Sequence, residues 1–310
     1  LLRTTDGGVE SILLGHTQYP HQLSWSPDGL WIASLDFTGA LFVWDVRKSR
    51  LAFTRSEKVA RVANFAWSPD GKFLASAEHG GIAILDPEGT VIDRIRIELG
   101  IYGVSWSSDG RRLAIALRDL QQFGIITQDE HEKWSEPKLI RTTIAGGPTR
   151  TSWSPDGRLL IAASFEALEV WDVSTWQVIN QWSCRDAINC DWERDSNHIL
   201  ISQQAPLVRR YEARGPKNAK PEEIAMNSAV SCAALSPDQR LFARGGHCVI
   251  DLVDRQGVLQ KTFTWPLPQP TLAVGWSPDG QRLASASGSR VFLHEVVGKG
   301  PSLKIGRLLT

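Results

Sequence analysis

The sequence contains 310 residues, of which 42% are hydrophobic, including 13 tryptophans and one methionine. A chain of this length and composition can bury a large core. Its 34 basic and 34 acidic residues give a formal net charge of zero, which argues against binding nucleic acid through a broad basic face. No run of 18 apolar residues occurs, so no membrane-spanning helix is expected.

A five-residue turn motif, Trp-Ser-Pro-Asp-Gly, is the first predicted element. Serine, proline, aspartate and glycine in this order are the residues that a type I β-turn favours. The tryptophan ends an apolar strand and a second apolar stretch follows the glycine, so each copy predicts a β-hairpin. Perfect copies occupy residues 25–29, 67–71, 153–157 and 276–280.

Three imperfect copies of the motif fill the gaps between the perfect ones. They begin at Trp106, Trp192 and Leu235, with the sequences WSSDG, WERDS and LSPDQ. The seven anchor residues that open the copies are spaced by 42, 39, 47, 39, 43 and 41 residues in chain order. The sequence therefore predicts seven repeats.

A second pattern, an apolar strand ending on a polar residue, lies 18 to 21 residues after each anchor. In six of the seven repeats the last residue of this strand is acidic. Polar or glycine-rich turns precede the strand and one more apolar run follows it, so each repeat holds four short strands, as a propeller blade does. The seven strand ends are Trp44-Asp45, Leu85-Asp86, Thr127-Gln128, Trp171-Asp172, Tyr211-Glu212, Val253-Asp254 and His294-Glu295.

The dipeptides Trp44-Asp45 and Trp171-Asp172, with Gly15-His16 ahead of the first repeat, resemble the signature of the WD-repeat β-propellers. The resemblance covers nearly the whole chain. It implies an all-β fold, a seven-bladed β-propeller of four-stranded antiparallel blades that forms one domain over residues 1–310. The expected blades span residues 16–54, 55–96, 97–143, 144–183, 184–226, 227–264 and 265–309.

The buried polar network of this family, made of aspartate, histidine, serine or threonine and tryptophan, is expected to be incomplete in every repeat. In the first repeat, Thr38 occupies the position six residues before Trp44 at which the aspartate is expected. Apolar and tryptophan packing is therefore predicted to hold the blades together more than this network does.

Either end of the chain could supply the last strand of the seventh blade. Residues 9–15 have the pattern of an outer strand, and residues 302–309 could fill the same place. The N-terminal strand is favoured, because joining both ends of the chain covers strand edges that would otherwise be exposed. The chain begins at Leu1 and not at a methionine, so it is expected to have been cut from a larger polypeptide or processed.

The cysteines and histidines give no sign of a catalytic or metal site. Cys184, Cys190, Cys232 and Cys248 have neither a C-x-x-C pair nor zinc-ligand spacing, and are predicted to be reduced core residues. Reduced cysteines indicate a cytoplasmic location, and the sequence shows no signal peptide. The hydrolase elbow, the P-loop and the H-E-x-x-H motif are absent. No catalytic residue, cofactor or metal is predicted.

Recognition by loops at one face of the blades is the predicted activity. These loops join the second and third strands or lead into the first strand, and aromatic and arginine side chains are common interface anchors. Tyr19 lies among these loops, and the candidate partner-binding residues on this top face are Phe37, Arg61, His79, Tyr102, Arg118, Phe165, His247 and Trp265. Two charged insertions, residues 128–138 and 212–223, are expected to be solvated loops, with Trp134 as a candidate contact on the bottom face.

The sequence thus predicts a non-catalytic scaffold or sensor module that binds a protein or a peptide. Nucleic acid and membrane are not expected as partners, whereas domains linked to the chain in a longer polypeptide are. Two alternatives stay open. The propeller could be a structural or autoinhibitory domain of a larger signalling protein, or an enzyme that uses the central channel of the propeller.

Overall fold

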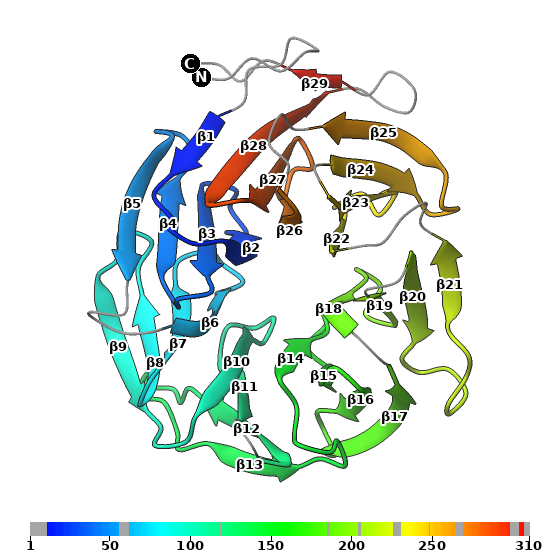
Figure 1. Cartoon of the computed structure of the whole chain (residues 1–310). Coiled ribbons are helices and arrows are strands. Elements are labelled where there is room, and N and C mark those ends of the chain that lie inside the picture. The colour runs from blue at the N-terminus through cyan, green and yellow to red at the C-terminus, as the bar shows by residue number, and fades with distance from the viewer. Residues whose placement is uncertain are drawn as a thin grey trace. The chain divides into compact units, whose positions relative to one another are not determined.

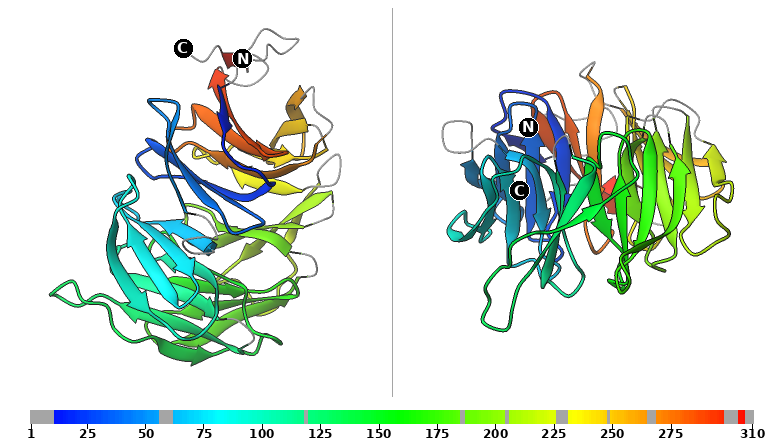
Figure 2. Two further views of the ribbon diagram at one scale, coloured as in Figure 1. Left: turned by 60° about the vertical axis from the view of Figure 1, so that its left-hand side comes forward. Right: turned by 90° about the horizontal axis from the view of Figure 1, so that it is seen from below.

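The computed structural model describes residues 11–55, 62–117, 120–184, 187–203, 206–225, 231–247, 249–264, 269–297 and 304–306. Every regular element within these residues is a β-strand, as the sequence predicted. The strands form seven antiparallel sheets, six of four strands and one of five. In each sheet, strands that follow one another in the chain lie side by side (Figures 1 and 2).

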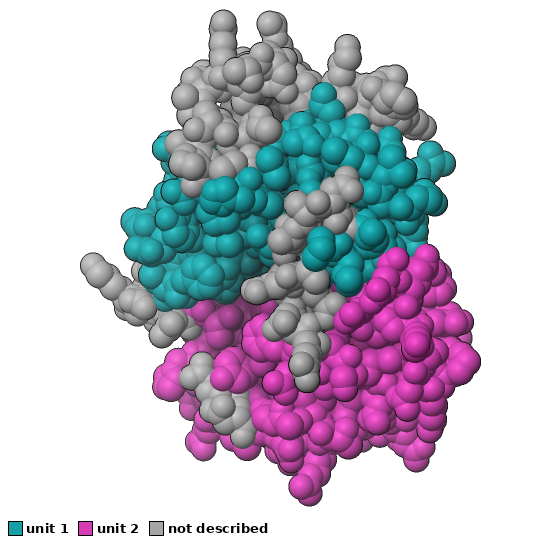
Figure 3. Space-filling view, turned by 45° about the vertical axis from the view of Figure 1, so that its right-hand side comes forward, with its two compact units in different colours: residues 1–57, 202–208, 224–310 teal, residues 58–201, 209–223 magenta. Residues whose placement is uncertain are grey.

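The chain divides into two compact units, coloured separately in Figure 3. Unit 2 comprises residues 58–201 and 209–223. It holds three complete sheets and most of a fourth. These are β6 (Val62–Trp67), β7 (Leu74–Glu78), β8 (Gly81–Leu85) and β9 (Val91–Arg96); β10 (Ile101–Trp106), β11 (Arg112–Leu117), β12 (Gln122–Thr127) and β13 (Lys138–Arg141); β14 (Arg150–Trp153), β15 (Leu159–Ala163), β16 (Ala167–Asp172) and β17 (Gln177–Ser183); and β18 (Ala187–Trp192), β19 (His198–Gln203), β20 (Leu207–Glu212) and β21 (Glu222–Ala225).

Unit 1 comprises residues 1–57, 202–208 and 224–310. It holds the three remaining sheets and the rest of the sheet from β18 to β21. The three sheets are β2 (Pro20–Trp25), β3 (Trp31–Asp36), β4 (Leu41–Asp45) and β5 (Arg50–Arg55); β22 (Cys232–Leu235), β23 (Leu241–Gly245), β24 (Val249–Asp254) and β25 (Leu259–Thr264); and β26 (Thr271–Trp276), β27 (Arg282–Ser287) and β28 (Arg290–Val297) with β1 (Ser11–Leu14) and β29 (Lys304–Gly306).

The predicted turn joins the first and second strands of each sheet. In the first copy, the Gly29 amide donates to the Ser26 carbonyl at 2.9 Å, which closes the turn. The Ser26 hydroxyl accepts from the Trp31 amide at 2.9 Å and donates to Asp28, whose carboxylate accepts from the Leu30 amide at 2.9 Å. The serine and the aspartate therefore bind the backbone on both sides of the turn and fix the start of the second strand.

The last residue of each turn has a left-handed backbone. In the perfect copies this residue is glycine, with φ between 68° and 73°. In two imperfect copies Ser196 and Gln239 adopt the same conformation, with φ of 57° and 64°. Such values cost free energy for any residue with a Cβ atom, so the motif is kept in these copies at the expense of local strain.

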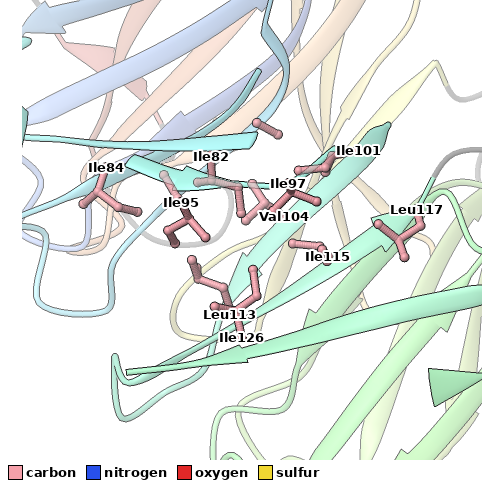
Figure 4. Packing of buried hydrophobic residues seen from close by; sticks show 12 residues of the cluster. Ile82, Ile84, Ile95, Ile97, Ile101, Val104, Leu113, Ile115, Leu117 and Ile126 are labelled. Atoms are coloured by element: carbon pink, nitrogen blue, oxygen red, sulfur yellow. The ribbon is translucent and has the colours of Figure 1, made fainter. Parts of the chain in front are cut away.

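Apolar clusters lie between neighbouring sheets of one unit. Figure 4 shows the cluster in unit 2 to which strands β7, β8 and β9 contribute side chains such as Ile82 and Ile95, and β10, β11 and β12 contribute Val104, Leu113 and Ile126. In the sheets of this cluster the second and third strands are almost wholly buried, as their continuous apolar runs predict.

The tryptophans that open the turn motif also join neighbouring sheets by hydrogen bonds. In unit 2, the indole N–H groups of Trp106 and Trp192 donate to the carbonyls of Ala66 and Ser152, each at 3.1 Å. In unit 1, Trp25 and Trp276 donate in the same way to Gly275 and Ala234, at 3.0 and 3.2 Å. The expected role of tryptophan packing thus includes a polar component that repeats from sheet to sheet.

The expectation that no repeat has a complete polar network is wrong for the first repeat. His16 Nδ1 lies 2.9 Å from Asp36 Oδ2, and His16 Nε2 lies 2.7 Å from Ser34 Oγ. The Trp44 indole donates to the same Ser34 oxygen at 3.1 Å. The acidic member is Asp36, the last residue of β3, and not the residue at position 38. Thr38 instead donates its hydroxyl to Asp36 Oδ1 at 2.6 Å.

Other sheets replace this network with different buried polar groups. In the sheet from β14 to β17, the Glu169 carboxylate accepts from the Trp171 indole at 3.1 Å and from the Thr143 amide at 2.9 Å. In the sheet from β22 to β25, Arg244 forms an ion pair with Asp251. Polar bonds therefore contribute to several sheets alongside the expected apolar packing.

Both ends of the chain pair with one long strand, β28. Residues 11–14 of β1 pair with residues 290–293 of β28, and residues 304–306 of β29 pair with residues 295–297 (Figure 1). The two candidate closing strands thus occupy successive parts of the same edge. β1 places Leu13 in the apolar cluster of Trp25, Phe42 and Trp44.

Candidate functional site

The first strand of each sheet starts at the same edge as the turn between the second and third strands, because consecutive strands are antiparallel. We call this the top edge of the sheet. Its turns are exposed, whereas the strands behind them are buried and hydrogen-bonded. Side chains on these turns are therefore held by a rigid base and are free to contact a partner.

In unit 1 the top edge of the first sheet carries an aromatic patch formed by Tyr19, His21 and Phe37. The rings of His21 and Phe37 have centroids 4.5 Å apart, and the Phe37 amide donates to the Tyr19 carbonyl at 3.4 Å. Tyr19 is 43% exposed and Phe37 is 60% exposed. Two large rings, Tyr19 and Phe37, are therefore open to solvent on segments that are hydrogen-bonded to each other, and the half-buried His21 ring packs against Phe37.

The buried polar network supports this patch from below. Asp36 precedes Phe37, and its Oδ1 atom accepts from the amides of Thr38 and Ala40, at 2.9 and 3.1 Å. Burial lowers the pKa of His16 although the carboxylate of Asp36 acts to raise it. Burial alone would raise the pKa of Asp36, but hydrogen bonds from Thr38 and His16 hold it below its ordinary value. The ionised Asp36 thus fixes the turn that presents Phe37.

In unit 2 the turn between β15 and β16 exposes Phe165, with 56% of its surface open to solvent. Ser164 Oγ accepts from the amides of Glu166 and Ala167, each at 3.1 Å, and so fixes this turn. The guanidinium carbon of Arg150, the first residue of β14, lies 5.8 Å from the centre of the Phe165 ring. This distance is within the range of a cation–π contact.

The other sequence-predicted residues of the top face have separate surroundings. His79 is exposed in the turn between β7 and β8, and Tyr102 is half-buried near the start of β10. His247 is exposed and forms an isolated bridge with Pro270. Arg61, Arg118 and Trp265 lie outside the described residues. The predicted set thus contributes Phe37 to one patch and Phe165 to another site, while His21 and Arg150 were missed.

Trp134, the candidate on the bottom face, packs against its own sheet. Its ring is 5.7 Å from that of Trp106 in an edge-to-face arrangement, and it lies against the apolar cluster between β7 and β12. Residues Gln128 and Trp134 form an isolated bridge that closes the insertion as a hairpin. The insertion is therefore anchored by its tryptophan, and its exposed tip is charged.

The second insertion is also pinned to a neighbouring sheet. The buried Asn180 of β17 donates to the Gly215 carbonyl at 3.2 Å and accepts from the Asn218 amide at 3.1 Å. The Trp182 indole donates to the Ala219 carbonyl at 2.9 Å. The composition of the insertion predicted a solvated loop, and it could not reveal these contacts because they come from side chains of another repeat.

One group of side chains in unit 2 has the donor atoms of a metal site. Ligand atoms of Glu193, Asp195 and His198 all lie within 4.8 Å of one another. They already have protein partners, since Arg210 Nε binds Glu193 at 2.7 Å and His198 Nδ1 contacts Asp195 at 2.5 Å. An ion-pair network explains this arrangement.

The described residues contain no helix, and so none long and apolar enough to cross a membrane. The described cysteines, Cys184, Cys190 and Cys232, are free thiols. Burial raises the pKa of Cys184 to about 11 and that of Cys232 to about 12. These thiols are therefore protonated and unreactive at neutral pH.

Two family models match parts of the chain. Residues 7–45 match the model described as WD domain, G-beta repeat. Residues 84–212 match the model described as eukaryotic translation initiation factor eIF2A. The WD-domain match contains Gly15-His16 and Trp44-Asp45, and it includes His16, Ser34, Asp36 and Trp44, the residues of the complete polar network.

Several curated proteins are similar to part of the chain. An intraflagellar transport protein 80 homolog of Mus musculus is 26% identical over 176 residues, which is 53% of this chain and 22% of that protein. WD repeat-containing protein 3 of Homo sapiens is 28% identical over 48% of this chain and 18% of its own length. The small ribosomal subunit protein RACK1 of Candida albicans is 31% identical over 37% of this chain and 39% of its own length. The alignments thus span well under half of each of these relatives.

A solved structure shows the same fold along most of the chain. The crystal structure of the Myceliophteria thermophila Cps50 (Swd1) β-propeller domain aligns with a TM-score of 0.74, 16% sequence identity and coverage of 93% of this chain and 100% of that one. At this identity the likeness concerns the fold. Together with the seven repeats, the matching WD-domain model and the WD-repeat relatives, it identifies the chain as a seven-bladed WD-repeat β-propeller.

Proposed function

We propose that this propeller is a non-catalytic scaffold or sensor module of the cytoplasm that binds a protein or peptide through side chains at the top edges of its sheets. The observation that carries the proposal is the aromatic patch of Tyr19, His21 and Phe37. Tyr19 and Phe37 are exposed although the turn beside them is held by the buried, hydrogen-bonded Asp36 and His16. Aromatic side chains on a rigid base lose little conformational entropy on binding and are common hot spots of protein interfaces.

The relatives support the same class of activity. Their names describe a transport protein, a WD-repeat protein and a ribosomal subunit protein. The sequence itself lacks the hydrolase, phosphate-loop and zinc-protease motifs. Free thiols in the described residues agree with a reducing compartment.

The test compares binding by the wild-type chain with binding by the double variant Tyr19→Ala/Phe37→Ala. Both chains are used as bait in a cell extract after chemical cross-linking, and bound proteins are quantified by mass spectrometry. A matched control, Val258→Ala/Leu259→Ala, removes two exposed apolar side chains from the outer part of another sheet of unit 1. We expect a partner whose recovery falls at least about tenfold with the first variant and is unchanged with the control.

Equal recovery by all three baits would contradict a binding role for the patch. Unfolding of each chain by heat is measured alongside, so that loss of binding is not confused with loss of structure. Because both substituted residues are largely exposed, the double variant is expected to unfold within a few degrees of the wild type.

A further inference from the structure

The repeat places equivalent residues on one accessible face of the first strands. The residue immediately before each anchor is partly or fully exposed in every sheet. In chain order these residues are Ser24, Ala66, Ser105, Ser152, Asp191, Ala234 and Gly275. Six of the seven are small and uncharged, and Asp191 departs from this pattern.

The residue two positions earlier lies on the same face of the strand, because side chains alternate along a strand. In chain order these residues are Gln22, Asn64, Gly103, Arg150, Asn189, Cys232 and Ala273. Arg150 is the one charged residue among them. The two charged residues of this face therefore fall on β14 and β18, which are neighbours in unit 2.

A hydrogen bond fixes the position of β18 relative to β14. The Trp192 indole, next to Asp191 in the chain, donates to the Ser152 carbonyl at 3.1 Å. Phe165 stands at the top edge of the same sheet as Arg150, and the Arg150 guanidinium lies over its ring. Arg150 and Phe165 thus contact each other on one sheet, and the Trp192 hydrogen bond holds Asp191 of the next sheet beside it.

The carboxylate of Asp191 forms no ion pair with the described residues. Its carboxylate accepts one hydrogen bond, from Asn189 Nδ2 at 2.8 Å, and no lysine, arginine or histidine of the described residues lies within ion-pair distance of it. The side chain is nevertheless exposed to solvent. Burial raises the pKa of Asp191 to about 6, and the charge of Arg150 acts in the opposite direction. Because the surrounding protein removes part of the water that would stabilise this charge, binding of a cation at the solvent-accessible carboxylate lowers the free energy.

We propose that the accessible face of β14 and β18 is a subsite for a lysine or arginine side chain of the protein partner. Asp191 accepts the N–H groups of this side chain, and the side-chain amide oxygen of Asn189 provides a second acceptor. The proposal rests on the protein-binding function proposed above and names the chemistry of one contact.

The positive charge of Arg150 determines whether ligand binding becomes tighter or weaker when Arg150 is replaced. Its positive charge repels a basic side chain bound at Asp191, so removing that charge strengthens the binding of a cation. An anionic ligand would reverse both signs, because it would need Arg150 and be repelled by Asp191.

The test titrates the whole chain with three capped pentapeptides, acetyl-Gly-Ala-X-Ala-Gly-amide, in which X is lysine, glutamine or glutamate. Binding is followed by NMR through the side-chain carboxyl carbon signals of aspartate. We expect the lysine peptide to bind at least about fivefold more tightly than the glutamine peptide, and Asp191→Asn to remove this preference. Arg150→Gln should tighten binding of the lysine peptide about twofold to fivefold, and the control Glu136→Gln, at an exposed site in the β12–β13 insertion, should leave it unchanged.

A second variant, Asp191→Ser, introduces the residue that three other repeats carry at this position, so it is compatible with the fold. It should lose the lysine preference as Asp191→Asn does. Equal binding of the lysine and glutamine peptides to the wild type, or retention of the preference in both variants, would overturn the proposal. Tighter binding of the glutamate peptide would also overturn it. These outcomes concern unit 2, whereas the protein-binding function is tested at Tyr19 and Phe37 of unit 1, so the two failures are distinguishable.

Discussion

His16 shows how a single side chain can connect stability with the presentation of a binding surface. One ring nitrogen contacts Asp36 and the other contacts Ser34, so both nitrogens are used although the ring is buried. Asp36 in turn holds the amides of the turn that exposes Phe37. The Cβ atom that an alanine would add at Gly15 would lie 2.9 Å from the Phe42 ring, which explains the glycine before this histidine.

Replacing His16 by alanine should destabilise the chain by about 2–4 kcal/mol, because the buried Oδ2 atom of Asp36 and the Ser34 hydroxyl would lose their histidine partner. The free energy of unfolding in urea measures this effect. His79→Ala, at an exposed turn residue, is the matched control and should cost less than about 0.5 kcal/mol. Similar losses for the two variants would contradict the role assigned to the network.

Asp191 should make stability depend on pH. Loss of surrounding water raises its pKa in the folded state to about 6, although the positive charge of Arg150 acts to lower it. The folded chain therefore holds this proton at a pH at which the unfolded chain has lost it, so stability falls as the pH rises from about 4 to about 6. Asp191→Asn should remove that fall and gain about 1 kcal/mol at pH 7.5, after allowance for solvent screening, with little gain at pH 4.

The measurement for Asp191 is urea unfolding of the wild type and the variant at several pH values. A variant whose stability follows the same pH profile as the wild type would show that the Asp191 carboxyl does not titrate in this range. Asp195→Asn is a useful comparison, because hydrogen bonds from His198 lower the pKa of Asp195 although its burial acts to raise it. Its removal should therefore decrease stability at neutral pH and not increase it.

At the scale of the element, the turn motif is the part of the sequence that best predicts the local structure. Its serine and aspartate form hydrogen bonds, and its glycine adopts a left-handed backbone angle, in every perfect copy. Local sequence therefore predicts the hairpin correctly. The same reliance on local spacing explains the wrong prediction at Thr38. Spacing alone could not place the acidic residue, because Asp36 reaches the network from the end of a strand and not from the turn.

The imperfect copies predict where the chain can be stabilised. Gln239→Gly should increase the free energy of unfolding by about 1 kcal/mol, because glycine adopts the left-handed conformation at Gln239 without steric cost. The matched reverse change, Gly280→Ala, should cost about the same amount, since an added Cβ would meet no atom closer than 3.6 Å and the cost is that of the backbone alone. Thermal unfolding of the two variants measures both effects, and equal signs would contradict the assignment.

Loops were predicted less well than strands. Composition identified the two insertions, but their contacts come from residues far away in the chain, such as Trp106 for Trp134 and Asn180 for the loop after β20. The candidate subsite was missed for a related reason. Asp191 and Arg150 are ordinary charged residues in the sequence, and they become notable only when the seven repeats are aligned on the strands that the structure defines.

At the scale of the whole molecule, the repeat made the fold predictable. Seven copies with two landmarks each gave the number of sheets and the number of strands in six of them, since each copy reports the same structure. The strands near the two ends of the chain were harder to predict, because each of them occurs once and has no repeated pattern. The sequence offered two candidates for one position, and a strand of eight residues, β28, pairs with both.

Leu13 tests the contribution of the N-terminal strand. Leu13→Ala should destabilise the chain by about 2–4 kcal/mol, because this side chain is 2% exposed and packs among Trp25, Phe42 and Trp44. Leu14→Ala, at a side chain that is 66% exposed, is the control and should be nearly neutral. In the Leu13→Ala variant, backbone hydrogen exchange should accelerate more in residues 290–293, which pair with β1, than in residues 295–297. An equal change along the whole of β28 would contradict the pairing.

The pairing of β1 with β28 has a consequence for synthesis on the ribosome. β1 is synthesised before its partner strand, which follows about 276 residues later. At about 5–20 residues per second, the N-terminal strand waits about 14–55 s with its hydrogen-bonding groups unpaired. During that interval an apolar segment with a free strand edge is open to mispairing, for example with the same segment of a neighbouring nascent chain on a polysome. A chaperone that binds short apolar segments would therefore have its longest opportunity at residues 11–14.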